Sequence, residues 1–426
     1  MLKSIAHFFS KAVKSPDIRK KLIITGVILI IFRLTAHIPT AGIDRTSLQA
    51  FFLGSPLLSL LDVFSGGTLA NFSIMALGLN PYINASIILQ LMQYVVPRLE
   101  ELSKEGEYGQ EKINQYTRFL TVPLSVFQAF AMYSLLKNQQ VISDFSPLSL
   151  LALVLTMTCG SMLAVWLGEL ISEYGIGNGV SFLIFAGIIA RMPVVFGQSI
   201  SIVQSQDILK IIMFLLIAVA IVGLIVFMNE ATRRVPISYA RQRRGLGSTS
   251  SYLPLRLNQA GVIPIIFAVS LVLLPSYLGQ FLAGSGNTTI ASAAAYMVKL
   301  FNPESFIYSA IYFLLVVGFT YFYTAVVFNP EKIAENLQKN GGFIPGVRPG
   351  GQTVAFLSKI LSRVTLIGAV FLGFVAILPS LFQGFLGMSN LSIGGTGILI
   401  VVSVVLEVTR DLEAQLVMKR YDAFIR

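Results

Sequence analysis

The sequence contains few charged residues. Only 12% of its 426 residues are Asp, Glu, Lys or Arg, whereas soluble domains carry about 25%. Hydrophobic residues make up 55% of the chain. Such a chain has too little charge to cover a large apolar content with a polar surface, so the composition argues against a soluble fold and predicts an integral membrane protein.

Cysteine and histidine are also scarce. Cys159 is the only cysteine, so no internal disulfide and no cysteine metal site can form. His7 and His37 are too far apart in the chain to make an obvious metal or catalytic pair. No two carboxylates lie centrally in apolar runs, where a proton relay or an intramembrane protease would need them. We therefore expect no enzyme activity, no metal and no cofactor.

Long apolar runs dominate the sequence instead. A bilayer core about 30 Å thick requires about 20 mainly apolar residues per helix. The first run is too long for a cleaved export signal and lacks a small-residue cleavage site, so we expect it to be retained. The runs predict an all-α membrane protein with ten transmembrane helices at 22–40, 74–96, 118–137, 149–171, 179–197, 208–229, 261–283, 305–328, 364–386 and 393–411.

The basic residues indicate the orientation of these spans. When the connections are assigned alternately to two sides, 25 of the 31 Lys and Arg residues fall on the side that holds both termini. Because cytoplasmic loops carry the excess of positive charge, both termini are predicted to be cytoplasmic. The main charge inside a span is Arg33, which we interpret as an arginine that contacts backbone carbonyls or snorkels, rather than as a substrate contact.

The topology predicts two halves of five spans that enter the membrane from opposite sides, with a pathway at their interface. The resulting organisation is a cytoplasmic amphipathic N-terminus (1–21), the N-terminal half with the sixth span (22–229), a basic cytoplasmic loop (230–260), spans seven and eight (261–328), a second basic loop (329–363), the last two spans (364–411) and a cytoplasmic tail (412–426).

Several spans contain or follow glycine and proline. Asn80-Pro81 is expected to interrupt the second span, and Gly175 to Gly179 precede the fifth. The external segment at about 62–72 is amphipathic, glycine-hinged and too short to cross the bilayer. It is either a surface helix or a re-entrant element packed inside the protein, and its residues alone leave both readings open.

The first basic loop has a pattern of its own. Residues 233–244 alternate Val, Ile and Tyr with arginines and proline, and Gly245 and Gly247 follow, which predicts a short β-ribbon. The loop can simply satisfy the positive-inside bias. Its length and its aromatic residue favour docking on a large partner, including one that contains RNA.

Seven stretches, in order along the chain, resemble the SecY family, the pore subunits of the bacterial preprotein translocase, which are related to the Sec61 alpha subunit. They are Phe64-Ser65-Gly66-Gly67, Pro81-Tyr82-Ile83-Asn84-Ala85-Ser86-Ile87, Gly175-Ile176-Gly177-Asn178-Gly179-Val180-Ser181, Arg233-Arg234-Val235-Pro236-Ile237 with Tyr239-Ala240-Arg241, Ala260-Gly261-Val262-Ile263-Pro264, Ile344-Pro345-Gly346-Val347-Arg348-Pro349-Gly350 and Gly394-Gly395-Thr396.

The resemblance implies a central pore closed by a ring of aliphatic side chains and a short re-entrant plug helix. An apolar constriction excludes ions by dewetting and still yields to a sliding chain. By matching motifs, the ring is Ile83, Ile87, Val180, Ile184, Val262, Ile266 and Ile400, and the plug is Phe64, Ser65, Gly66, Gly67, Thr68, Leu69, Ala70 and Asn71. Without the resemblance, each ring residue would be read as ordinary helix packing.

The resemblance also implies partners in the bacterial inner membrane. Gln128 and Asn258 match polar positions of a lateral gate toward lipid, where preprotein signal sequences enter. SecE is implied as a clamp, SecG as an accessory and anionic lipids as surroundings. Docking of the SecA motor ATPase or the ribosome is implied for Arg233, Arg234, Arg241, Arg243, Arg244 and Arg348.

Two places depart from the family pattern. Residues 38–43 read Ile-Pro-Thr-Ala-Gly-Ile, with Thr40 where a second proline is usual, and Arg191 stands where a small residue is expected. The alternative function is a secondary transporter of a small solute, which would normally require a coupling carboxylate at the membrane midplane. An intramembrane hydrolase would need a catalytic dyad, and a purely structural scaffold would leave the chain-long resemblance unexplained.

Overall fold

A computed structural model describes most of the chain. The described residues are 15–40, 62, 65–69, 71–138, 142, 145–202, 208–239, 251–283, 288–302, 305–386 and 394–425.

Helices make up most of the described chain, and each predicted span overlaps one of the longer helices. The longer helices are α2 (Pro16–Thr35), α5 (Asn80–Val95), α7 (Glu107–Asn138), α8 (Pro147–Tyr174), α9 (Gly179–Ile202), α10 (Ile208–Glu230), α11 (Ile263–Ala283), α13 (Phe306–Val327), α15 (Gly351–Leu386) and α16 (Gly394–Ile425). Three shorter helices, which the sequence did not reveal, are α6 (Pro97–Lys104), α12 (Thr288–Leu300) and α14 (Pro330–Lys339).

Within the described residues, 4 helical stretches are long and apolar enough to cross a membrane: Glu107–Lys137, Pro147–Tyr174, Phe306–Lys339 and Gly351–Leu378. Gly179–Pro193, Ala218–Glu230 and Ile263–Ser276 are shorter apolar helices. These stretches confirm a multi-pass membrane protein of the all-α class. The number of ten spans stays a prediction.

The second predicted span begins later than the sequence indicated. Helix α5 starts at Asn80 with Pro81 in its first turn, so the prediction that this pair interrupts a longer span is wrong. Proline is favoured there because the first backbone N–H groups of a helix have no partner inside the helix. The preceding residues form turns in which Phe72 (φ 43°) and Gly78 (φ 55°) have left-handed backbones.

Several helices extend beyond the predicted spans into the basic connections. Helix α7 begins at Glu107, α15 begins at Gly351 and α16 continues to Ile425. Lys, Glu, Gln and Arg are good helix formers, so a helix need not end where its apolar run ends. The predicted loop at 329–363 and tail at 412–426 are therefore largely helical.

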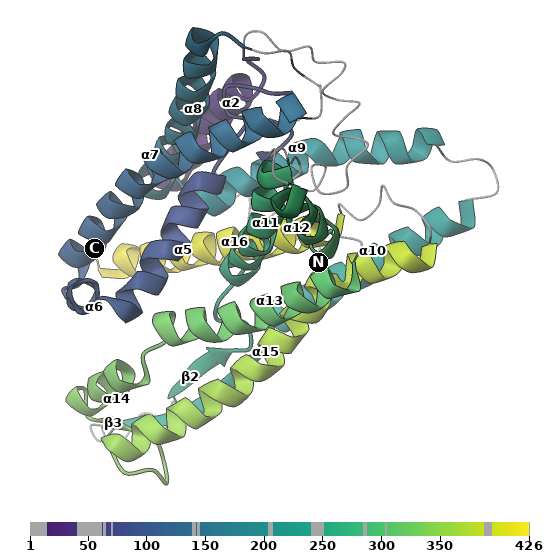
Figure 1. Cartoon of the computed structure of the whole chain (residues 1–426). Helices are drawn as coiled ribbons and strands as arrows, with labels where there is room; N and C mark the ends of the chain where they lie inside the picture. Colours follow the sequence, from purple (N-terminus) through teal and green to yellow (C-terminus); the bar gives the residue numbers. More distant parts are fainter. Residues whose placement is uncertain are drawn as a thin grey trace.

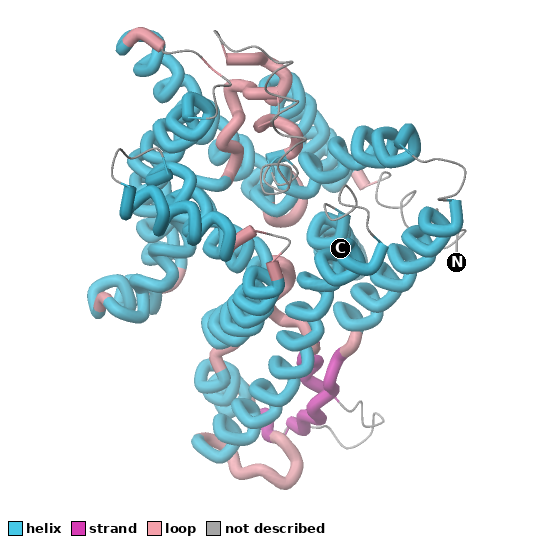
Figure 2. Tube along the Cα trace, turned by 45° about the vertical axis from the view of Figure 1, so that its right-hand side comes forward, coloured by secondary structure: helices cyan, strands magenta, loops and turns pink. Residues whose placement is uncertain are grey.

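A small sheet confirms the predicted ribbon. Strand β1 (Thr232–Tyr239) pairs antiparallel with β2 (Ser251–Arg256), and β3 (Gly342–Phe343) of the second basic loop pairs with the other edge of β1, giving the order β2-β1-β3. Figure 2 shows these strands together at one end of the molecule. Val235 and Ile237 alternate inward and are buried, which matches the period of a strand.

The longer helices form two groups. In one group α5 packs on α7, α7 on α8, and α8 on α9 and α2; in the other α11 packs on α13, α13 on α15, and α16 on α15 and α10. Figure 1 shows α2, α7 and α8 together and, apart from them, α13 and α15. The groups meet where α5 and α7 contact α11, and again where α9 contacts α16. The described helices thus place an interface between groups on two sides, and the inverted relation of the halves stays a prediction.

Candidate functional site: a constriction beside a buried plug segment

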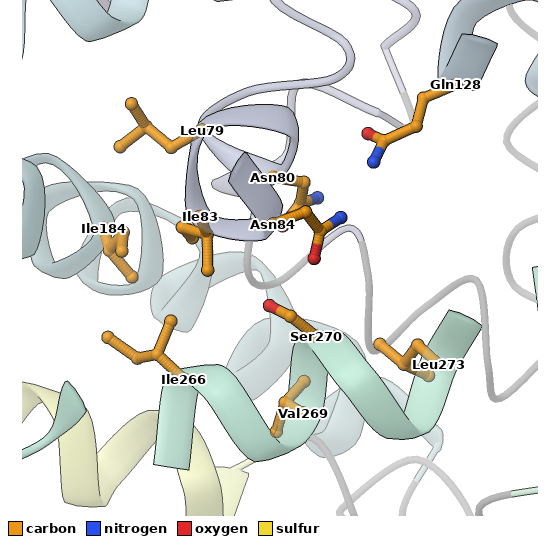
Figure 3. Close-up of a pocket in the computed structure, with 10 residues that line it drawn as sticks. All are labelled: Leu79, Asn80, Ile83, Asn84, Gln128, Ile184, Ile266, Val269, Ser270 and Leu273. Atoms are coloured by element: carbon orange, nitrogen blue, oxygen red, sulfur yellow. The ribbon is translucent and has the colours of Figure 1, made fainter. Parts of the chain in front are cut away.

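Three predicted ring residues surround one small cavity between the groups. Ile83 of α5, Ile184 of α9 and Ile266 of α11 come from three separate helices and point into the same space (Figure 3). The cavity holds ≈ 30 Å³, and the three side chains are 7%, 5% and 6% exposed. The three isoleucines form an aliphatic side of this cavity, whose other lining includes the polar side chains of Asn80, Asn84, Gln128 and Ser270. A close ring of aliphatic carbon is the condition for excluding water and ions.

The other predicted ring residues lie in the same core but do not line that cavity. Ile87, Val262 and Ile400 are buried in the hydrophobic cluster that includes the three isoleucines. Val180 is partly buried beside Gly168 of α8. A Cβ added to Gly168 would lie 3.3 Å from Cγ2 of Val180. The structure thus brings three residues around a shared space, and a ring of seven remains a prediction.

A second cavity adjoins the first at the contact between α5, α7 and α11. It has a volume of ≈ 140 Å³ and a mostly apolar lining to which Phe127, Met132 and Leu278 contribute. Gln128 and the amides Asn80 and Asn84 line both cavities. Gln128 is therefore at the interface between the groups, and its role in a lateral gate stays a prediction. The two asparagines are polar neighbours that sequence reasoning missed.

Asn258 lies elsewhere, in a buried hydrogen-bonded cluster. Its Nδ2 donates to Asn229 Oδ1 at 2.9 Å and to the Gly261 carbonyl at 3.2 Å. Asn229 Nδ2 donates in turn to the Ile225 carbonyl at 3.1 Å and to Ser403 Oγ at 3.4 Å. Asn258 thus ties the end of the basic loop to α10 and α16, and it lines neither of the two cavities.

In the described part of the predicted plug, residues 65–69 are buried and Asn71 is partly buried. Ser65, Thr68 and Leu69 are 6%, 1% and 2% exposed, and Leu69 lines the 140 Å³ cavity. The segment is a series of tight turns: Gly67 N–H donates to the Asp62 carbonyl at 2.8 Å, and Thr68 Oγ1 donates to the Ser65 carbonyl at 2.8 Å. Phe64 and Ala70 lie outside the described residues. This burial favours the re-entrant reading over a surface helix.

Two arginines hold this segment. Arg191 Nη2 of α9 lies 2.9 Å from Asp62 Oδ2, and Arg33 Nη1 of α2 donates to the Gly66 carbonyl at 3.1 Å. Arg33 therefore contacts a backbone carbonyl, as interpreted from the sequence, but it does so from the last turn of α2 rather than from mid-span.

The ion pair of Asp62 differs from other pairs of the described residues in its burial. Lys339 and Glu335 of α14 lie 2.6 Å apart with side chains 69% and 61% exposed, whereas the Asp62 and Arg191 side chains are 2% and 22% exposed. The Lys339 hydrogen bond lowers the pKa of the Glu335 carboxyl. Exposed pairs of this kind contribute little to stability, while a carboxylate removed from water depends on its partner.

Three of the predicted docking arginines are described, on the small sheet or on the second basic loop. Arg233 and Arg234 are exposed on β1, and the Arg234 guanidinium lies 4.9 Å from the centre of the Tyr252 ring. Arg348 is exposed on the second basic loop, and Arg241, Arg243 and Arg244 lie outside the described residues. A core of Val235, Leu255, Ile344 and Leu357 joins both loops, so Arg233, Arg234 and Arg348 are carried by segments that pack on one another.

No group of three or more His, Cys, Asp or Glu side chains in the described ranges is placed to hold a metal ion. Cys159 on α8 is a free, exposed thiol.

Comparison with known proteins identifies clear relatives. The family model described as SecY matches residues 73–409. The protein translocase subunit SecY of Streptomyces scabiei is 42% identical over 441 residues, covering 98% of this chain and 99% of the relative. The protein of the same name from Mycobacterium tuberculosis strain H37Rv is 40% identical over 440 residues, with the same coverage of 98% and 99%.

Solved structures share the fold. A structure of a protein-conducting channel has a TM-score of 0.66 at 18% identity, and a SecY structure concerned with closed-state stabilisation by the plug domain has a TM-score of 0.67 at 19% identity. Sec61 in a canine ribosome-channel complex has a TM-score of 0.65 at 17% identity. Each comparison covers 94% of this chain and 93% of the other.

Proposed function

The chain belongs to the SecY family, and from this premise we propose that it forms the protein-conducting channel of a bacterial preprotein translocase. The observation that carries the proposal is the aliphatic constriction of Ile83, Ile184 and Ile266, which directly adjoins the cavity between α5, α7 and α11. The alternative prediction, a secondary transporter of a small solute, finds no support in these relatives.

The constriction and the plug segment together seal the idle channel. Apolar side chains leave no water column for ions to follow, and they separate around a passing chain without the loss of any hydrogen bond. The buried plug segment lies beside them and borders the second cavity through Leu69. Moving both out of the way opens the pathway across the membrane.

Signal sequences enter, and hydrophobic segments leave toward lipid, between α5 and α7 on one side and α11 and α13 on the other. The contacts across this seam are few and separable: α5 and α7 touch α11, and the Tyr94 and Phe322 rings lie 5.0 Å apart. Asn80, Asn84 and Gln128 place amides along the seam. Their exposure to lipid during opening costs free energy, which sets how hydrophobic a signal must be.

The energy for transport comes from partners. The exposed arginines of the sheet, together with Arg348, dock SecA or the ribosome, whose acidic or phosphate groups match this charge. The family resemblance supplies SecE as a clamp, SecG as an accessory and anionic lipids as surroundings. The same proposal places the chain in the bacterial inner membrane with both termini in the cytoplasm, where the basic loops lie.

A disulfide crosslink tests the proposal. In a Cys159→Ser, Ile184→Cys variant, a stalled preprotein with one cysteine should crosslink to position 184, and only when the signal sequence and SecA are both present. The matched control is Ile189→Cys on the same helix, at a side chain 41% exposed. Equal crosslinking at both positions contradicts the constriction, and a complex that binds and moves no preprotein contradicts the channel function.

A further inference from the structure

The burial of the Asp62 carboxylate costs free energy. Its side chain is 2% exposed, and a charge without water is tolerated only when a partner of opposite sign lies close by. That partner is Arg191 on α9, with Nη2 2.9 Å from Oδ2. The arginine that departs from the family pattern is therefore the residue that neutralises the buried plug charge.

Backbone geometry places the same segment against the same helix. Gly66 has φ +75°, and a Cβ on it would lie 2.6 Å from the Cα of Gly187 on α9. A Cβ on Gly187 would lie 2.9 Å from the Gly66 Cα, so only two glycines permit this approach. Gly187 precedes Arg191 by one helical turn, and the two residues together form one seat for the plug on α9.

A third contact comes from a different helix. Arg33 of α2 donates to the Gly66 carbonyl at 3.1 Å, so the segment is gripped from α2 as well as from α9. Both side chains that contact the segment, Arg33 and Arg191, carry guanidinium groups, which remain charged and keep their planar geometry at any physiological pH.

We propose that Asp62 and Arg191 form a latch that positions the plug segment in the idle channel, with Arg33 as its second support. The latch rests on the proposed channel function. Opening separates the Asp62 carboxylate from its guanidinium, and both groups then need water or new partners. The strength of this one pair therefore sets how often the idle plug leaves its seat, before any signal sequence acts.

The exposure of a buried plug residue measures the latch directly. Thr68 is 1% exposed, so in a Cys159→Ser, Thr68→Cys background a membrane-impermeant maleimide reacts only when the segment leaves its seat. The labelling rate is measured in spheroplasts that produce the variant with its natural partner subunits. We expect Arg191→Gln and Asp62→Asn each to raise the rate about tenfold or more, because each leaves one polar group of the pair without its partner.

The double variant separates a latch from two independent effects. If the residues act as a pair, Asp62→Asn with Arg191→Gln labels no faster than the faster single variant, since the second change has no interaction left to remove. Arg191→Lys keeps the charge but loses the planar fork, and its rate should fall between wild type and Arg191→Gln. Arg118→Gln, which breaks an ion pair with Glu169 on α8, is the matched control and should leave the rate unchanged.

Three results overturn the latch: unchanged labelling in both single variants, a double variant whose rate is the product of the single effects, or an equal rise in Arg118→Gln. If the Arg191→Gln variant does not insert into the membrane, the labelling rates of Arg191→Lys and Asp62→Asn still test the latch. Preprotein export is measured in the same cells. Normal export together with unchanged labelling contradicts the latch but not the channel function. Failed export in the parent, together with the expected changes in labelling rate, contradicts the channel function but not the latch.

Discussion

At the plug seat, Asp62 and Gly66 meet Arg191 and Arg33 through an ion pair and a hydrogen bond, whereas at the constriction Ile83, Ile184 and Ile266 meet one another through aliphatic side chains alone. The polar contacts need particular atoms at particular distances, so they exist in one geometry and fail together when it is lost. Aliphatic contacts depend on area and re-form around almost any chain. The plug seat is thus a specific closure that depends on exact polar contacts, and the constriction beside it is an adaptable closure that depends on apolar area. Substitutions at each can test the two separately.

The largest effect is expected from Gly66→Val, which attacks the specific closure through the backbone. Valine at φ +75° is strained, and its Cβ would lie 2.6 Å from the Gly187 Cα. The seated state should lose about 3 kcal/mol or more, which is roughly a hundredfold rise in the labelling rate of Thr68→Cys. Gly318→Val on α13 is the control, because nothing lies within 4 Å of an added Cβ there. Similar rates for the two variants would refute the seat.

A somewhat smaller effect is expected from Ile184→Asn, which attacks the adaptable closure. An amide in place of Ile184 attracts water to the aliphatic side of the cavity, opposite the amides already there, so the idle ion current of the complex in planar bilayers should rise about tenfold. Labelling of Thr68→Cys should change much less, since the plug contacts are untouched. Ile184→Val preserves the apolar surface and serves as control; equal currents from the asparagine and valine variants would show that wetting does not govern the barrier.

Asn258→Leu asks whether a buried polar contact far from the plug behaves like the plug seat. The change removes the donor to Asn229 Oδ1 and to the Gly261 carbonyl, at a cost of about 1–3 kcal/mol in unfolding free energy. Thermal unfolding of the purified complex should start several degrees lower. Gln338→Leu, at an exposed amide of α14, should have little effect. An unchanged melting temperature in Asn258→Leu would mean that water replaces the lost donor.

The smallest effect is expected from Arg234→Ala, at a polar contact that remains in water. Stability should change by no more than about 0.5 kcal/mol. Ribosome binding, followed by co-sedimentation over a series of salt concentrations, should lose about one unit of salt slope, as for one phosphate contact. Arg234→Lys should retain the slope, and Arg19→Ala, an exposed arginine on α2, should not alter it. An effect of Arg19→Ala equal to that of Arg234→Ala would show that ribosome binding depends on the overall positive charge and not on Arg234 in particular.

Local patterns in the sequence were sufficient for much of the fold. Apolar runs predicted a helix at each long element, and the alternation of Val235 and Ile237 predicted the ribbon. An apolar run indicates which part of a helix suits lipid, but it does not indicate where the helix begins or ends. Helices α7, α15 and α16 therefore extend further than predicted. Pro81 was taken for a break because the run on both sides of it is apolar, although proline at a first turn begins a helix equally well.

The site was accessible in part. Motif matching located Ile83, Ile184, Ile266 and Gln128, which the fold brings to one interface. The contact between Arg191 and Asp62 has no sequence signature, because it joins residues far apart in the chain through the packing of α9 against the plug segment. The only available signal was the departure itself: an arginine in a predicted span requires a counter-charge, and Asp62 lay without an assigned partner in the predicted first external segment. Arg191 was predicted at a span end, whereas α9 continues to Ile202.

The sheet that joins the two basic loops has a mechanical consequence. Strand β3 leads within a few residues into α15, which is a single helix of 36 residues, or about 54 Å of rigid rod. This rod packs along α13, one wall of the seam between the two helix groups. A partner that pushes or twists the sheet therefore moves a long helix that packs along α13, and displacement at the predicted docking arginines becomes strain at the seam.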